Sequence, residues 1–292
     1  MYTIKFGTDG WREIIAKDYT VENVRRVSAG TAQWMANTGA NKKIVLGYDC
    51  RFGGIMFAKA AAEVFVDFGI EVLFADKFVS TPMVSMAANE YSAGLGIVLT
   101  ASHNPASYNG FKLKAAYGGP ASPSDVAEIE TLIPERVEDT ISFEKALSEG
   151  KIRFSSFEDL YFEKAAATFD LDLLRSNGSK FIYDAMYGAG QDVFKRLIPT
   201  ATVLNGTFNP SFNGTAPEPI AKNLKEISNT ISQGDYLCGL ATDGDADRIG
   251  FFDGDGNFVD SHHLILLLMQ YLVSAKGYKG KVVKSLSVSD KI

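Results

Sequence analysis

The sequence predicts an α/β protein made of repeated three-layer α/β/α domains, each with a mostly parallel sheet. Its predicted strands are short, continuous apolar runs, which is typical of strands covered by helices on both faces. Segments with helical character separate them, as crossover connections between parallel strands require. This order of elements occurs twice in the 292 residues and begins a third time, so two complete domains and part of a third are expected.

The first copy of the repeat is predicted from three helices that alternate with three strands. The helices are expected at residues 20–39, 56–69 and 80–90, and the strands at 43–49, 71–75 and 94–100. The last strand leads into the loop TASHNP (100–105). The polar stretch 118–140 is interpreted as a surface excursion, and the first domain is expected to end near residue 150.

The second copy repeats this order. Its helices are expected at 158–169, 188–198 and 218–231, and its strands at 180–185, 201–205 and 236–242. The last strand leads into the loop TDGDADR (242–248). Open α/β sheets bind ligands at loops beyond the carboxyl ends of their strands, so both loops are candidates for a ligand site.

A third copy is expected to start with a helix at 261–277 and a strand at 281–287, after which the sequence ends. The predicted domains are therefore 1–150, 151–258 and 259–292, with the third repeat truncated. A truncated domain would expose the apolar run LILLLMQYLV that begins at Leu264. Self-association through this run is therefore expected.

Composition restricts the partners and the compartment. The net charge is −6 and no stripe is rich in lysine and arginine, which argues against nucleic-acid binding. No basic start precedes an apolar signal core, and Gln270 interrupts an apolar run already too short to span a bilayer. Cys50 and Cys238 lack metal-type spacing and are expected to be reduced, buried thiols. A cytoplasmic protein with no membrane partner is predicted.

Three carboxylates alternate with small residues in the second loop. Asp243, Asp245 and Asp247 are separated by Gly244 and Ala246, which let the loop turn so that three oxygens converge on one cation. Oxygen ligands favour Mg²⁺ or Mn²⁺ over softer metals. The spacing excludes an EF-hand, which needs a glycine at position six and a glutamate at position twelve. A phosphatase that acts through Asp243 remains an alternative.

The first loop places Ser102 beside His103. No glycine frames the serine as the nucleophile elbow of a hydrolase requires. A metal that supports phosphoryl transfer suggests another role for the hydroxyl. As a phosphoserine, Ser102 would offer oxygens to Mg²⁺ and transfer its phosphoryl group to a sugar hydroxyl.

Four motifs together resemble the α-D-phosphohexomutases, the family that includes phosphoglucomutase and phosphomannomutase. They are FGTDGWR (6–12), TASHNP (100–105), NGFK (109–112) and DGDADR (243–248). The resemblance covers essentially the whole chain. It implies a sugar-phosphate substrate, converted from hexose 1-phosphate to 6-phosphate through a bound 1,6-bisphosphate. It also implies Mg²⁺ as cofactor and glucose 1,6-bisphosphate as activator.

The resemblance implies that Ser102 carries the phosphoryl group. It also implies that Asp243, Asp245 and Asp247 bind Mg²⁺, with the Ser102 phosphate completing the ligand set.

Four further residues are implied to act on the transferring group. Lys112 and His103 would lie where a proton moves to and from the sugar hydroxyl, and Arg12 and Arg248 would pair with phosphoryl oxygens. Structural roles are the alternative for each of them: a solvated edge lysine, a histidine that braces the loop, and two arginines that only balance aspartates.

Other polar residues near strand ends are interpreted differently. Asp49 and Arg51 follow a predicted strand and are expected to be structural. His262 and His263 begin a predicted helix without a partner at ligand spacing, so neither is a site candidate.

The resemblance implies four domains, of which the third and fourth supply the loops that read the sugar hydroxyls and grip the non-reacting phosphate. The sequence ends at Ile292, before either loop. The chain is therefore expected to be an N-terminal fragment with impaired turnover. The alternative is a non-catalytic metal- and phosphate-binding module that needs a partner chain. NGFK and DGWR favour glucose or mannose phosphates over the phosphoglucosamine branch, where isoleucine is commoner at both apolar positions.

Overall fold

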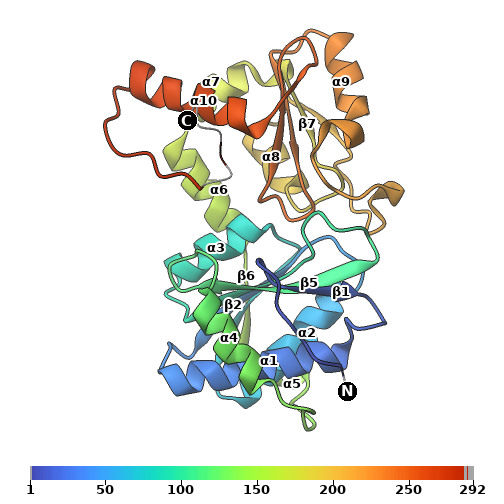
Figure 1. Cartoon of the computed structure of the whole chain (residues 1–292), viewed down its shortest axis with the longest axis vertical. Coiled ribbons are helices and arrows are strands. Elements are labelled where there is room, and N and C mark those ends of the chain that lie inside the picture. The colour runs from blue at the N-terminus through green and yellow to red at the C-terminus, as the bar shows by residue number, and fades with distance from the viewer. Residues whose placement is uncertain (1, 286–287, 289–292) are drawn as a thin grey trace.

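Two mixed β-sheets organise the chain into two α/β units, one above the other in Figure 1. The computed structural model describes residues 2–285 and 288. The predicted α/β fold class is confirmed. Each sheet has a parallel centre and an antiparallel edge, because the strand after each candidate loop returns beside the strand before it, through a link too short for a crossover.

The first sheet has the strand order β1-β5-β4-β2-β3-β6. Its strands are β1 (Trp11–Ile14), β2 (Lys43–Tyr48), β3 (Glu71–Ala75), β4 (Leu95–Leu99), β5 (Tyr108–Ala115) and β6 (Ile152–Ser155). Its helices are α1 (Val21–Thr38), α2 (Gly54–Asp67), α3 (Thr81–Glu90), α4 (Pro123–Leu132) and α5 (Phe143–Ser148).

The alternation of side chains along β5 shows how the two faces of this sheet differ. Phe111 and Leu113 point into the core formed with α1, α2, α4 and α5. Lys112 and Lys114 therefore point to the opposite face, where α3 packs. Polar side chains that begin the helices fix their entry points. The Ser80 hydroxyl, for example, accepts a hydrogen bond from the Met83 backbone N–H at the start of α3.

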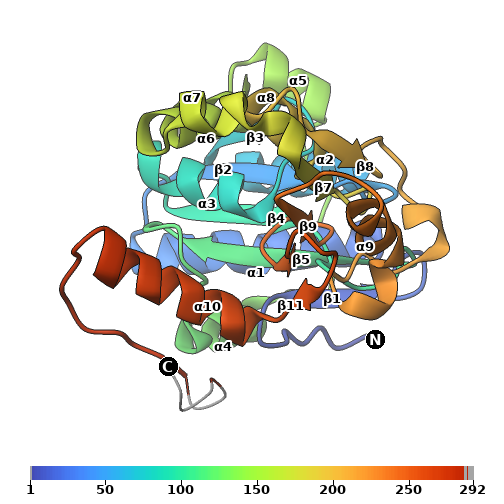
Figure 2. The ribbon, with the colours of Figure 1, turned by 90° about the horizontal axis from the view of Figure 1, so that it is seen from above.

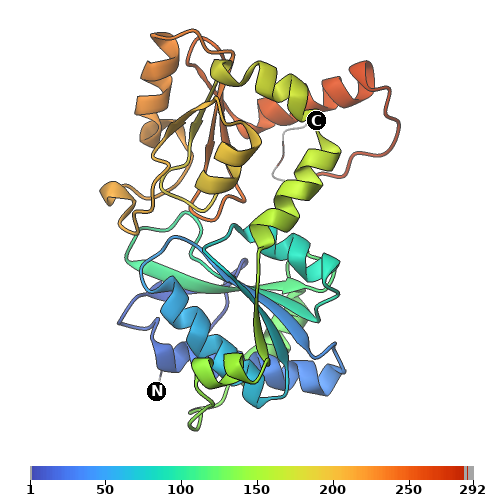
Figure 3. The ribbon, with the colours of Figure 1, turned by 180° about the vertical axis from the view of Figure 1, so that it is seen from behind.

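Two expectations for the first unit are corrected. The boundary near residue 150 falls too early, because β6 pairs in parallel with β3 and belongs to the first sheet. Figure 3 shows β6 continuing directly into α6, which leads to the second unit. The stretch 118–140 is also more than a surface excursion. It contains α4, which starts with a capping box at Ser122 and buries Ile129 against the core.

The second sheet has the strand order β11-β10-β9-β7-β8. Its strands are β7 (Phe181–Asp184), β8 (Thr202–Leu204), β9 (Cys238–Thr242), β10 (Ile249–Phe252) and β11 (Phe258–Val259). The helices are α6 (Phe157–Thr168), α7 (Leu171–Ser176), α8 (Gln191–Leu197), α9 (Lys225–Ser232) and α10 (Ser261–Gln270), with 3₁₀ turns at Gly178–Lys180, Phe212–Gly214 and Ala221–Asn223.

The expected third copy is only partly found. Its helix begins as predicted at Ser261 but ends at Gln270, and a π-helical turn follows at Tyr271–Ala275. The expected strand 281–287 is wrong over residues 281–285, where no partner strand pairs with the chain and Val283 is almost fully exposed. Residues 286 and 287 lie outside the described residues.

A shared apolar cluster holds the two units together. It joins Val98 of β4 and Val84 of α3 to Phe157 of α6 and Val193 of α8. This packing brings the carboxyl end of β4 toward the carboxyl end of β9. Both cysteines are free, as expected, but only Cys50 is buried, whereas Cys238 is partly exposed. No helix of residues 2–285 is long and apolar enough to cross a membrane.

Candidate active site

The two loops predicted to bind ligands meet between the units. Figure 2 looks down from the second unit and shows β9 in front of β4 and β5 of the first unit. Ser102 Oγ, at the end of β4, donates a hydrogen bond to Asp243 Oδ2, at the end of β9, over 2.6 Å. The predicted serine and the predicted carboxylate loop therefore form a single site.

The backbone around Ser102 is held in an unusual conformation. Ser102 is fully buried and has a φ of +52°, in the left-handed region that non-glycine residues seldom adopt. Its backbone N–H donates to Thr100 Oγ1 over 2.8 Å, and Thr100 Oγ1 donates to Asp49 Oδ2 over 2.6 Å. The Ser102 hydroxyl is thereby directed at the carboxylate loop.

Arg51 supports the loop between β4 and β5, here called the serine loop (residues 100–107). Its guanidinium is buried and pairs with Asp49, with 3.3 Å between Arg51 Nε and Asp49 Oδ2. It also donates hydrogen bonds of 2.7–2.9 Å to the backbone carbonyls of Ser102, Asn104, Pro105 and Tyr108. Asp49 and Arg51, which were expected to be structural, hold the loop that presents Ser102.

The carboxylate loop curls as its small residues predict. One oxygen from each of Asp243, Asp245 and Asp247 lies within 4.8 Å of the others. Asp243 Oδ1 accepts hydrogen bonds from the backbone N–H groups of Asp247 and Arg248, both over 3.0 Å. A Cβ on Gly244 would lie 2.5 Å from the Ser102 carbonyl oxygen, so only glycine allows the two loops to approach this closely.

Lys112 is the cation at the centre of this acidic cluster. Its Nζ lies 2.7 Å from Asp245, 2.9 Å from Asp247 and 2.7 Å from Asp9. Burial opposes the charge on Lys112, but the three carboxylates raise its pKa above the ordinary value, so the ammonium stays protonated. Lys112 is therefore a buried member of the site rather than a solvated edge lysine.

The two buried aspartates have different electrostatic surroundings. Burial, and the neighbouring Asp245 carboxylate, raise the pKa of Asp243. Burial also opposes ionisation of Asp245, but contact with Lys112 lowers its pKa overall. Asp245 is further fixed by Thr81, whose hydroxyl donates to Asp245 Oδ2 over 2.6 Å.

The carboxylates fit a hard divalent cation. Asp245 Oδ1 is buried and has no hydrogen-bond partner among the described residues, although a buried carboxylate oxygen normally has one. A cation between Asp243, Asp245 and Asp247 would satisfy this oxygen and offset the mutual repulsion of the three carboxylates.

The remaining predicted residues surround Ser102 in different ways. Arg12 donates hydrogen bonds to Asp9 Oδ2 over 3.0 Å and to Asn104 Oδ1 over 3.3 Å. Burial, followed by the positive charges of Arg248 and Arg12, lowers the pKa of His103. The side chain of Arg248 is exposed and makes no hydrogen bond or ion pair within residues 2–285.

Asp9 and Thr81 are residues that the sequence reasoning missed. The Asp9 carboxylate pairs with Arg12 over 3.0 Å and also contacts Lys112 over 2.7 Å. Its place in the motif FGTDGWR was an available signal. No sequence signal indicated Thr81, because its contact with Asp245 spans 164 residues.

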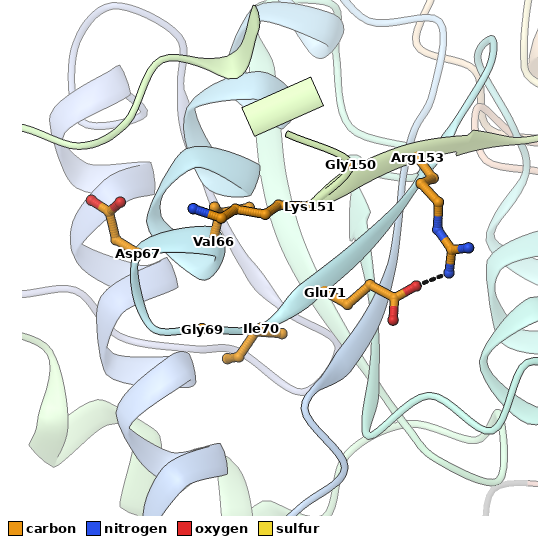
Figure 4. A pocket seen from close by; sticks show the side chains of 8 residues that line it. All are labelled: Val66, Asp67, Gly69, Ile70, Glu71, Gly150, Lys151 and Arg153. Atoms are coloured by element: carbon orange, nitrogen blue, oxygen red, sulfur yellow. Dashed lines mark hydrogen bonds and ion pairs between the residues drawn. The ribbon is translucent and has the colours of Figure 1, made fainter. Parts of the chain in front are cut away.

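One cavity of the first unit, shown in Figure 4, is remote from the candidate active site. It has a volume of about 580 Å³ and lies beside Ile70, Glu71, Lys151 and Arg153. These residues are at the amino ends of β3 and β6, whereas Ser102 follows the carboxyl end of β4 in the same sheet. Arg153 already pairs with Glu71.

Comparisons with known proteins agree with this geometry. Residues 3–139 match the model of phosphoglucomutase/phosphomannomutase, alpha/beta/alpha domain I, and residues 159–256 match domain II. The first match contains Ser102 and the second contains the three aspartates.

Relatives and solved structures extend the similarity along the chain. A protein of Methanosphaera stadtmanae named a probable phosphoglucosamine mutase is 32% identical over 97% of this chain and 61% of its own length. A Sulfurisphaera tokodaii phosphoglucosamine/phosphogalactosamine mutase is 31% identical over 97% of this chain and 62% of its own. The crystal structure of a candidate phosphomannomutase from Thermus thermophilus superposes with a TM-score of 0.90 at 31% identity, covering 99% of this chain and 65% of that one.

The chain thus spans about three fifths of the length of the curated relatives it matches. The two matched domain models together account for most of its residues, and the relatives described above are mutases by name. The chain belongs to the phosphoglucomutase/phosphomannomutase family.

Proposed function

We propose that this chain carries the phosphoserine and the metal site of a hexose-phosphate mutase, which interconverts hexose 1-phosphate and 6-phosphate through a 1,6-bisphosphate. One observation carries the proposal. The Ser102 hydroxyl lies 2.6 Å from a carboxylate of the acidic loop, so a phosphoryl group on Ser102 would lie beside a cation held by that loop.

Ser102 is the proposed phosphoryl carrier. The Oγ–P bond of phosphorylated Ser102 breaks, an O–P bond to the sugar hydroxyl forms, and the hydroxyl proton replaces the phosphoryl group on Ser102 by way of a nearby base. Mg²⁺ held by Asp243, Asp245 and Asp247 would supply positive charge, which would offset the negative charge on the transferring phosphoryl group. The hydrogen bonds to the Ser102 backbone keep Oγ in place during the exchange.

The structure suggests different roles for His103 and Lys112. His103 is the better proton acceptor, because its lowered pKa leaves the imidazole neutral near pH 7 and its buried Nδ1 has no partner among the described residues. Lys112 has a raised pKa and stays protonated, so it supplies positive charge. Arg12 and Arg248 add positive charge on the side of His103.

The choice of hexose is a separate part of the proposal. Trp11 and Phe111 favoured glucose or mannose phosphates, but both side chains are fully buried and face each other across β1 and β5. Their identity therefore reflects packing and is a poor guide to the sugar. The names of the relatives support amino-sugar phosphates, so glucosamine phosphate belongs in the first assay beside glucose and mannose phosphates.

The first experiment measures the intact mass of the chain before and after incubation with Mg²⁺ and the 1,6-bisphosphate of glucose, mannose or glucosamine. We expect one added phosphoryl group, located on Ser102 by peptide mapping. Ser102→Ala should abolish the addition, and Ser107→Ala is the matched control because Ser107 lies exposed in the same loop. Absence of phosphorylation on Ser102 with all three bisphosphates would contradict the proposal. Phosphate release that survives Ser102→Ala would favour a phosphatase acting through Asp243.

A further inference from the structure

Lys114 is a buried lysine whose nearest carboxylates, those of Asp9, Asp247 and Asp245, act on it from beyond ion-pair distance. It is 8% exposed, and within residues 2–285 no hydrogen bond or ion pair involves its Nζ. Burial, followed by the positive charge of Lys112, lowers its pKa, and the carboxylates of Asp9, Asp247 and Asp245 oppose this only in part. A buried charge without a partner is costly, so this arrangement leaves Lys114 able to gain from a negatively charged ligand.

The position of Lys114 follows from the sheet. It lies two residues after Lys112 on β5, so both side chains are on the face that packs against α3. On the neighbouring strand β4, Gly96 lies opposite Lys114. A Cβ added to Gly96 would lie only 3.2 Å from Lys114 Cβ. The glycine therefore leaves room for the lysine stem beneath α3.

Lys114 lines a cavity of about 580 Å³ between α3, the turn after β5 and α6. Figure 1 shows α3 and α6 adjacent where the two units meet. Ser85, Asn89 and Tyr161 also line the cavity and add a hydroxyl, an amide and a phenol. The side chains of these three residues make no hydrogen bond within the described part of the chain, so each can bond a ligand.

The charges around the cavity leave Lys114 as the unpaired one. Lys164 is neutralised by Glu90 at 2.9 Å, and Asp247 is paired with Lys112 at 2.9 Å. These are the other charged residues that line the cavity. Among the charged side chains that line the cavity, Lys114 is therefore the one without an ion pair within residues 2–285.

We propose that this cavity is a second anion site, which binds the phosphoryl group of a small phosphorylated compound apart from the group that reacts at Ser102. Several phosphoryl oxygens can each accept a bond from a different element: the ammonium on β5, the amide and hydroxyl on α3, and the phenol on α6. None of these four donors belongs to the serine loop or the carboxylate loop, although Asp247 of the carboxylate loop borders the cavity.

The test is a calorimetric titration of the full chain, in metal-free buffer, with inorganic phosphate and with glucose 6-phosphate. We expect Lys114→Gln to weaken binding of at least one of these ligands by about tenfold, the loss of one charge-assisted hydrogen bond. Lys164→Gln is the matched control, since this lysine lines the same cavity but is already paired, and it should change the affinity far less.

The two probes separate free phosphate from a sugar-linked phosphoryl group, and binding of either one that depends on Lys114 supports the site. Equal affinities for the wild type and Lys114→Gln, or no binding of either probe to the wild type, would overturn it. The Ser102 phosphorylation assay is independent, so failure of the anion site and failure of the proposed mutase reaction are distinguishable. Circular dichroism checks that Lys114→Gln is folded, which is expected because the variant removes an unpaired buried charge.

Discussion

Replacing Arg51 with methionine would test how the serine loop is maintained. The guanidinium pairs with Asp49 and donates hydrogen bonds to four backbone carbonyls between Ser102 and Tyr108. Methionine keeps much of the apolar stem but leaves the buried Asp49 carboxylate without its cation. Breaking a buried ion pair from one side costs about 3–5 kcal/mol, and this is the loss of unfolding free energy expected near neutral pH.

The loss should depend on pH because Asp49 can be protonated. Burial raises the pKa of Asp49 to about 6, although Arg51 and a hydrogen bond from Thr100 lower it. A raised carboxyl pKa contributes stability at low pH that is lost as pH rises through the folded-state value. Without Arg51 that value moves higher still. The penalty of Arg51→Met should therefore grow by about 2 kcal/mol between roughly pH 5.5 and pH 7.5.

Urea unfolding at these two pH values measures the effect, and Asp49→Asn supplies the control. In the double variant no unpaired carboxylate remains, so its loss should be smaller than the sum of the single losses. A loss for Arg51→Met below about 1 kcal/mol, the size of one ordinary hydrogen bond, would refute the reasoning. So would a loss that is the same at both pH values.

Three further predictions concern the metal loop, its lysine and the core. A hundredfold excess of Mg²⁺ over its Kd should stabilise the chain by about 2.7 kcal/mol in thermal unfolding; Asp247→Asn should reduce this gain, and an unchanged melting temperature of the wild type would contradict the metal site. Lys112→Met should cost about 3–5 kcal/mol in urea unfolding without metal, because it leaves the buried Asp245 uncompensated; a near-neutral result would exclude this role. Trp11 lies in the core and stacks on Tyr19, so Trp11→Ala should lower the free energy of unfolding by about 3–5 kcal/mol. Phe208 is 61% exposed, so Phe208→Ala should change it by no more than about 0.5 kcal/mol. Similar losses for both variants would contradict the assignment of the core.

Much of the fold was predictable because it depends on local patterns. Continuous apolar runs predicted the central strands β2, β3 and β4 close to their observed bounds, since buried parallel strands need such runs. The alternation of aspartate with small residues likewise predicted a loop whose carboxylates converge. These features arise within a few residues of one another, so periodicity and spacing are sufficient to find them.

Other elements were misjudged because their structure depends on distant partners. The strand β6 reads as the start of a second domain, yet it is a strand of the first sheet because β3 offers it a free edge. The segment 281–285 has a strand-like composition but no partner strand, and an unpaired strand is not stable alone. Strand composition does not reveal which edge, if any, is available.

The sequence by itself determined the central helices and parallel strands of each unit, the two loops, and the residue types of a phosphoryl-transfer site, but not the added strands at the sheet edges. Tertiary structure alone decided that Ser102 meets Asp243 across 141 residues of chain, that Arg51 holds the serine loop, and that Lys114 has no ion pair among the residues that the structure describes. The physical reason is that local patterns are set by short-range backbone geometry, whereas these contacts depend on how α3 and β4 pack against α6 and α8.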